Sequence, residues 1–239
     1  MKCKNTAADA IRTAESISLI ALPLALAIAF LLHYTTLSDF FTFKLIKPPY
    51  SAGHLLQTLT SPDRGFRQYI LPHLVGYLAL PLFIPASLVL ANTVYNRAPW
   101  HATIGAALAC FGVVFMGGVF GSWLSFAAIV NVSVEASANL LAVLQTLTSM
   151  QGTLMLSSVL SALTFLGMII LGFGLYQSKI TPRWSAVLFI LGNALILAFI
   201  DLDNWMFIGA LLMFIGMLPL SMRLFQPTLT ERNQEPKIA

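Results

Sequence analysis

Apolar residues along this chain fall into six runs that short polar segments separate. A helix rises about 1.5 Å per residue, so about 20 apolar residues cross the ~30 Å hydrocarbon core of a bilayer. The fifth and sixth runs barely reach that length, and two acids lie between them in Asp201-Leu202-Asp203-Asn204. Carboxylates are costly in mid-bilayer, so this tetrapeptide is interpreted as a tight turn at the membrane surface. The predicted spans cover residues 17–34, 69–95, 103–130, 152–176, 185–200 and 205–222.

The fold class that follows is an all-α, polytopic membrane helix bundle with six transmembrane spans. It forms a single integral membrane domain over residues 1–239, in which residues 223–239 are a short polar cytoplasmic tail. Charged residues make up 9% of the chain, whereas soluble domains carry about 25%. Cys3 and Cys110 cannot form a disulfide framework and lack metal-ligand spacing. No nucleic-acid signal is present, and the expected partner is the lipid bilayer.

The distribution of Lys and Arg predicts the orientation. Nine of the 13 lie in the amino-terminal segment, the 96–101 and 177–184 loops and the tail, and the other loops hold four. Because basic residues are retained on the cytoplasmic side, both termini are predicted to be cytoplasmic. In the turn of Lys179 and Arg183, Thr181 should cap the next helix and Pro182 should lie in its first turn.

The hexapeptide LQTLTS occurs twice, at Leu56–Ser61 and at Leu144–Ser149, each time before a span on the predicted outer side. Each of the two spans ends in a Tyr and continues through a Pro-containing loop into another span. A duplicated two-helix unit would enter the membrane in the same direction twice, as in the parallel repeats of some transporters. The alternative is chance combined with shared helix-entry chemistry.

The segment LGFGLYQSKITPRWSAVLFILGNALIL, Leu171–Leu197, carries a family resemblance. It resembles part of an uncharacterised bacterial family of multi-span membrane proteins, in which a span ends in Leu-Tyr and a short basic Ile-Pro-Arg-Trp turn leads into another apolar span. The resemblance implies a multi-pass protein of the bacterial inner (cytoplasmic) membrane. It implies no activity.

Several small and polar residues of the spans predict packing. Gly117, Gly121 and Ser125 share one stripe of the third span, where a neighbouring backbone can approach closely. Packing within the protein is the main interpretation of this stripe, and a homo-oligomer face or the lining of a solute path are the alternatives. The second span should bend at its prolines, and most of the buried polar residues should form helix-to-helix hydrogen bonds. These residues are Pro72, Pro81 and Pro85, and Asn193, Ser157, Ser158 and Ser161.

No ionisable residue lies at the centre of a predicted span, and the titratable residues near the membrane gather on the outer side. Imidazoles and carboxylates are ligands that zinc uses, and an open zinc site could activate water for hydrolysis. No pair has a motif spacing, so only folding could bring them together; otherwise they are interfacial polar groups. The candidate metal ligands are His33, His73, Glu135, Asp201 and Asp203, with His54 in the same outer region.

Three functions remain open. The leading hypothesis is a non-catalytic membrane component, because the chain has no nucleophile elbow, phosphate-binding loop or other catalytic motif. A small-solute transporter is the alternative, and it predicts a water-accessible cavity lined by Asn193 or the span-four serines. The third hypothesis is a metal-dependent hydrolase with its site on the outer face, for which zinc would be the cofactor.

Overall fold

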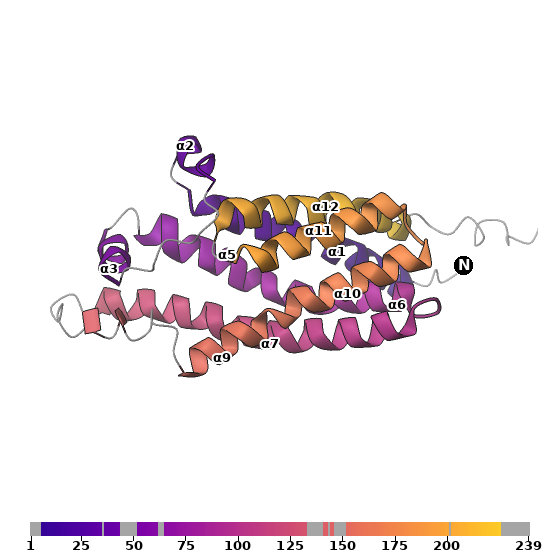
Figure 1. The fold of residues 1–239 in the computed structure, drawn as a ribbon, viewed down its shortest axis with the longest axis horizontal. Helices are drawn as coiled ribbons and strands as arrows, with labels where there is room; N and C mark the ends of the chain where they lie inside the picture. Colours follow the sequence, from indigo (N-terminus) through magenta and orange to yellow (C-terminus); the bar gives the residue numbers. More distant parts are fainter. Residues whose placement is uncertain are drawn as a thin grey trace, which may run out of the picture.

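In the computed structural model the chain forms an elongated bundle whose long helices lie side by side (Figure 1). All regular structure in the described part of the chain is helical. The main helices are α1 (Thr6–Leu32), α5 (Leu71–Ala79), α6 (Phe83–Val94), α7 (Pro99–Val132), α9 (Gly152–Ser161), α10 (Leu163–Ser178), α11 (Arg183–Ala198) and α12 (Asp203–Phe225). The structure describes residues 6–34, 36–43, 52–61, 65–132, 141–142, 144–145, 152–200 and 202–225.

Two short helices lie at one end of the bundle, where the sequence suggested only a polar segment (Figure 1). They are α2 (Leu37–Phe40) and α3 (Ala52–Thr60). We call this end the α2 end. The opposite end carries the turns between α6 and α7 and between α10 and α11, which we call the turn end.

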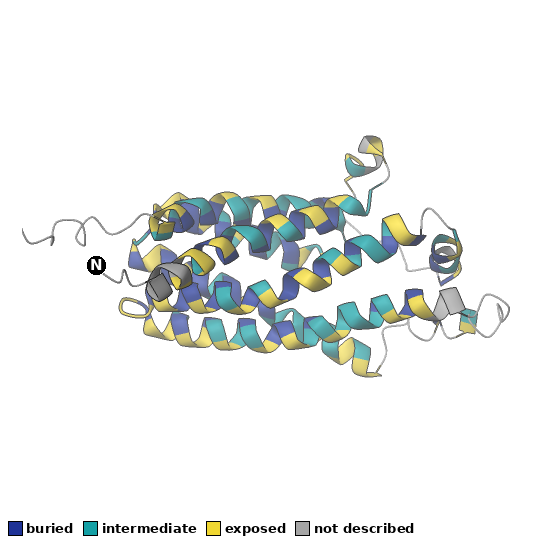
Figure 2. Cartoon of the chain, turned by 180° about the vertical axis from the view of Figure 1, so that it is seen from behind, coloured by how far each residue is buried: buried dark blue, intermediate teal, exposed yellow. Residues whose placement is uncertain are grey.

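Five helical segments in the described residues are long and apolar enough to cross a membrane. They are Thr13–Leu32, Gly65–Val94, Pro99–Ala128, Gly152–Ser178 and Asp203–Phe225. Many large apolar residues of these helices are exposed. Figure 2 shows that the exposed positions lie on the outer faces of the helices and the buried ones face inward. The all-helical character predicted from the sequence is therefore confirmed, and the five apolar helices fit a membrane protein. The fifth predicted span is the 16-residue α11, which at about 1.5 Å per residue is about 24 Å long.

The proline-rich second span changes helix type along its length. It begins as a π-helix, η1 (Gly65–Ile70), and a 3₁₀ turn, η2 (Leu80–Leu82), separates α5 from α6. Pro72 lies in the first turn of α5 and Pro81 lies within η2. Proline lacks an N–H and clashes with the carbonyl of residue i−4, so each interrupts the regular α-helical hydrogen bonds. The helix type changes next to Pro72 and at Pro81, whereas Pro85 lies within α6, and the predicted bend stays a prediction.

Glycines set the closest helix crossings of the core. A β-carbon at Gly192 of α11 would lie 2.5 Å from the carbonyl oxygen of Gly209 in α12. One at Gly167 of α10 would lie 2.5 Å from the carbonyl oxygen of Gly105 in α7. Only residues without side chains allow backbones to approach this closely, and van der Waals contact between backbones replaces the missing side chains.

Three predictions about polar side chains are wrong. The hydroxyls of Ser158 and Ser161 donate to carbonyls of Leu154 and Ser158 in their own helix, rather than to another helix. The amide of buried Asn193 donates to Phe189 of its own helix, 2.8 Å away. Short polar side chains on a helix reach carbonyls three or four residues back more easily than a neighbouring helix. The residue that caps α11 is Pro182 rather than Thr181, with no side-chain capping bond.

Candidate functional site

Side chains from three helices meet at the α2 end. His33 directly follows α1, His73 lies in α5 and Asp203 is the first residue of α12. The Nδ1 atom of His33 lies 3.5 Å from Oδ1 of Asp203, and the rings of His33 and His73 meet edge to face with centroids 5.1 Å apart. We call these three residues the His–Asp cluster.

The helix ends in this cluster favour a positive charge on His33 and a negative charge on Asp203. His33 stands at the carboxyl end of α1, where a positive charge is favourable, and Asp203 stands at the amino end of α12, where a negative charge is favourable. Their side chains are 23% and 29% exposed, so solvent reaches both groups. A protonated His33 therefore forms an ion pair with Asp203 that links the first and last helices.

His73 lies among aromatic rings. Its ring centroid is 4.5 Å from that of Tyr69 and 6.1 Å from those of Phe120 and Trp123. Nδ1 of His73 lies 2.7 Å from the carbonyl oxygen of Tyr69, so this nitrogen carries the proton and donates it. The neutral ring then presents Nε2 as an acceptor.

Tyr34 and the start of α12 complete the surroundings of Asp203. Burial, and after it the negative charge of Asp203, raises the pKa of Tyr34 to about 12. Asn204 is buried, and its amide donates to the carbonyl of Thr42 at 3.3 Å, which ties the residues after α2 to α12. Phe40 packs edge to face against Phe207, with centroids 5.2 Å apart. The short α2 segment is therefore anchored beside the cluster.

The structure thus brings together three of the five predicted metal ligands. His33, His73 and Asp203 meet, whereas Glu135 and Asp201 lie outside the described residues, as does the side chain of His54. Within the described ranges, no group of three His, Cys, Asp or Glu side chains is arranged to hold a metal ion. Two adjacent imidazoles and a carboxylate can still exchange protons, and an imidazole N–H can donate a hydrogen bond to a ligand.

The aromatic enclosure of His73 was not predicted. Tyr69 lies four residues before His73, a spacing that places two side chains on one helix face, so the sequence held a signal for this neighbour. Trp123 enters from α7, where its backbone carbonyl accepts a hydrogen bond from the Tyr69 hydroxyl at 3.2 Å. No pattern in the sequence indicated that contact.

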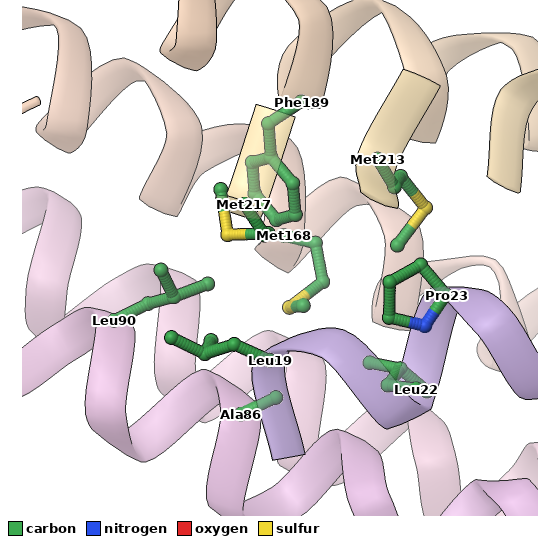
Figure 3. Close-up of a pocket in the computed structure, with 9 residues that line it drawn as sticks. All are labelled: Leu19, Leu22, Pro23, Ala86, Leu90, Met168, Phe189, Met213 and Met217. Atoms are coloured by element: carbon green, nitrogen blue, oxygen red, sulfur yellow. The ribbon is translucent and has the colours of Figure 1, made fainter. Parts of the chain in front are cut away.

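A second candidate site is the apolar hollow where five helices converge near the middle of the bundle (Figure 3). It contains about 180 Å³ of unfilled space between side chains, and none of it is wide enough for a water molecule. The lining comprises Leu19, Leu22, Pro23, Ala86, Leu90, Met168, Phe189, Met213 and Met217. It includes neither Asn193 nor a span-four serine, so this hollow is not the polar cavity expected of a transporter.

The third candidate is the small-residue stripe of α7. A β-carbon added at Gly118 or Gly121 would meet nothing within 4 Å, and one at Gly117 would meet only Leu80, 4.0 Å away. Ser122 and Ser125 donate their hydroxyls to carbonyls of α7 itself. Among the described residues, the main interpretation from the sequence, that this stripe packs within the protein, has support at Gly117 and none at Gly118 or Gly121, so it stays a prediction.

Comparison with known proteins adds no further information, because no family model, curated protein or solved structure matches this chain. The fold and composition define its class as a helical, membrane-embedded bundle.

Proposed function

We propose that this chain is a non-catalytic component of the bacterial inner membrane that assembles with a second copy of itself through α7. The observation that carries the proposal is that an added β-carbon at Gly118 or Gly121 would meet nothing within 4 Å among the described residues, whereas eight other helix glycines are closely packed.

The contrast among the glycines supports an external partner. At Gly76, Gly105, Gly112, Gly167, Gly172, Gly192, Gly209 and Gly216 an added β-carbon would come within 3.0 Å of an atom of another element. Glycine in a helix costs about 1 kcal/mol relative to alanine, and at these positions close packing offsets that cost. Gly118 and Gly121 carry the same cost with no packing among the described residues, which supports a contact with a second copy.

The exposed face of α7 changes character along its length. Its first half presents the large apolar residues Ile104, Phe111 and Val114, which are 44%, 51% and 69% exposed and suit lipid chains. Gly118 and exposed Ser125 continue the same face, with Gly121 between them. Lipid chains gain few van der Waals contacts against such small side chains, whereas a second helix can approach the backbone of α7 closely.

A second copy fits this stripe because the two α7 helices would lie in the same orientation and at the same depth. A two-fold axis along the membrane normal would place Gly121 of one copy against Gly121 of the other, as in parallel dimers with small residues four apart. Disulfide crosslinking tests this arrangement, with Cys3 and Cys110 replaced by serine. We expect oxidation in membranes to yield a covalent dimer of Ser125→Cys.

Leu166→Cys is the matched control, because Leu166 is 40% exposed on the apolar face of another helix, α10. This variant should remain monomeric. If Ser125→Cys also stays monomeric, the α7 interface is wrong. Dimer yields that are equal for both variants would indicate random collision in the bilayer rather than a specific interface.

The proposal includes six crossings with both termini in the cytoplasm. Its support is that α11 packs against α10 and α12 and runs between the ends of the bundle (Figure 1), although it is shorter than the five long segments. An impermeant maleimide applied to intact spheroplasts should label Ile200→Cys and leave Lys179→Cys unlabelled. Labelling of both or neither would mean that α11 does not cross.

The parallel repeat stays a prediction. Its first copy lies in α3, where Leu59 is buried and Leu56 is only partly buried, while Leu144 at the start of the second copy is buried in the same cluster.

Zinc at the His–Asp cluster also stays a prediction. Elemental analysis of the purified wild type beside His73→Ala tests it, and bound zinc that the variant lacks would support the hydrolase hypothesis.

A further inference from the structure

Four basic side chains gather around the turn between α10 and α11, at the turn end. Lys179 and Arg183 belong to this turn. Arg97 reaches it from the α6–α7 turn and donates to the carbonyl of Ser178, and Arg223 reaches it from the last turn of α12 and donates to the carbonyl of Ile180 at 2.8 Å. All four residues are exposed. We call them the basic cluster.

The positive charge of this cluster is not neutralised within the described part of the chain. The ion pair found there joins His33 to Asp203 at the α2 end, and no carboxylate of a described residue lies within 4.0 Å of any of the four cations. Arg97 and Arg223 each have five N–H donors and use one guanidinium nitrogen on a backbone carbonyl. The remaining donors are available to an anion.

Lys179 occupies a backbone conformation that suits glycine. Its φ of 53° is positive, and among the described residues it is the non-glycine residue with this property. Glycine is the usual residue at such a helix end, because a side chain in the left-handed region adds strain. The dipole of α10 favours a positive charge at its carboxyl end, where Lys179 lies. The dipole alone does not account for a lysine in a strained backbone conformation beside three arginines.

Aromatic side chains mark the depth of the cluster. Trp100 and Trp184 are 76% and 52% exposed at the first turns of α7 and α11, and exposed Tyr176 lies in the last turn of α10. Such rings prefer the headgroup region of a bilayer. The guanidinium carbon of Arg183 lies 5.4 Å from the Tyr176 ring centroid, so this contact holds Arg183 at the same level.

We propose that the basic cluster binds the phosphate of an anionic phospholipid in the leaflet at the turn end. The cluster supplies guanidinium and ammonium donors, and the exposed tryptophan rings supply surfaces for the glycerol and upper acyl chain. The inference rests on the proposed function, because it requires the turn end to lie at a bilayer surface. Each cation should raise the preference for an anionic over a zwitterionic lipid by about fivefold.

Fluorescence quenching by brominated lipids tests the site. The full chain is reconstituted in vesicles of phosphatidylcholine and phosphatidylglycerol, with either lipid brominated on its acyl chains. Trp123 and Trp205 are replaced by phenylalanine, so that Trp100 and Trp184 report the lipid beside the basic cluster. We expect brominated phosphatidylglycerol to quench more strongly than its share of the vesicle predicts.

Lys179→Gly is the decisive variant, because glycine suits the local backbone and so protects the fold. Its melting temperature in phosphatidylcholine should equal or exceed that of the wild type, while its preference for phosphatidylglycerol falls about fivefold. Arg67→Gln, which removes an exposed cation from η1 toward the α2 end, is the matched control and should leave the preference unchanged.

The possible failures have different meanings. Equal quenching by the two lipids in the wild type, or an unchanged preference in Lys179→Gly, would overturn the headgroup site. An equal loss of preference in Arg67→Gln would also overturn it, because the preference would then reflect net charge alone. Absence of quenching by either lipid would instead overturn the membrane placement on which the site depends.

Discussion

The crossing of α11 and α12 gives a direct test of how closely these helices pack. A β-carbon added at Gly192 would lie 2.5 Å from the carbonyl oxygen of Gly209 and 2.7 Å from the backbone nitrogen of Met213. Ordinary van der Waals contact begins at 3.4 Å, so Gly192→Ala requires a displacement of about 0.9 Å, the difference between 3.4 and 2.5 Å. Both obstructing atoms belong to the backbone, so no change of rotamer can relieve the overlap.

Two effects of opposite sign determine the outcome of Gly192→Ala. Alanine is better than glycine in a helix by about 1 kcal/mol. Overpacking of a core costs about 1–3 kcal/mol, and the rigid backbone contact at this crossing places the cost near the upper value. The expected net loss is about 2 kcal/mol, which lowers the ratio of folded to unfolded protein about 30-fold.

The free energy of unfolding can be measured by titrating the protein in mild detergent micelles with a denaturing detergent and following helix content. Gly118→Ala is the control, since a β-carbon there meets nothing within 4 Å. In dilute micelles, where copies separate, this variant should gain up to about 1 kcal/mol. Wild-type stability in Gly192→Ala, or an equal loss in Gly118→Ala, would refute the argument from helix spacing.

Two further predictions concern buried polar groups. The raised pKa of Tyr34 means that the unfolded chain ionises this residue from about pH 10, whereas the folded chain does so near pH 12. Stability should therefore fall between these pH values, and thermal unfolding of Tyr34→Phe should lack that loss. The hydroxyls of fully buried Ser16 in α1 and Ser221 in α12 lie 2.6 Å apart. A double-mutant cycle with alanine should give a favourable coupling of about 0.6–1.7 kcal/mol, and strictly additive losses would contradict a direct bond.

The sequence predicted the bundle because the bilayer thickness fixes how long an apolar run must be. Both α7 and α12 appear where the runs lay, since each is bounded by polar residues at its ends. The short helices α2 and α3 were missed, because a helix of a few residues leaves no clear period. The break between α9 and α10 at Ala162 was also missed, since no proline or glycine marks that position.

The sequence could predict some features of the candidate sites, whereas others depend on tertiary packing. Counting spans predicted one membrane side for His33, His73 and Asp203. Their contact depends on how α1, α5 and α12 pack, which the sequence does not show. The spacing of Gly117, Gly121 and Ser125 indicated a close-packing surface. Sequence alone could not decide whether another helix of the same chain covers it, because glycines that are packed and unpacked in the fold look alike in the sequence.

The most direct test of the central proposal is the molar mass of the purified protein in mild detergent, with the detergent contribution subtracted. The wild type should have the mass of two chains. Gly121→Leu should have the mass of one, because a leucine at this position of α7 holds the two backbones apart, while its β-carbon meets nothing within 4 Å among the described residues. A monomeric wild type, or a dimer that survives Gly121→Leu, would contradict assembly through α7.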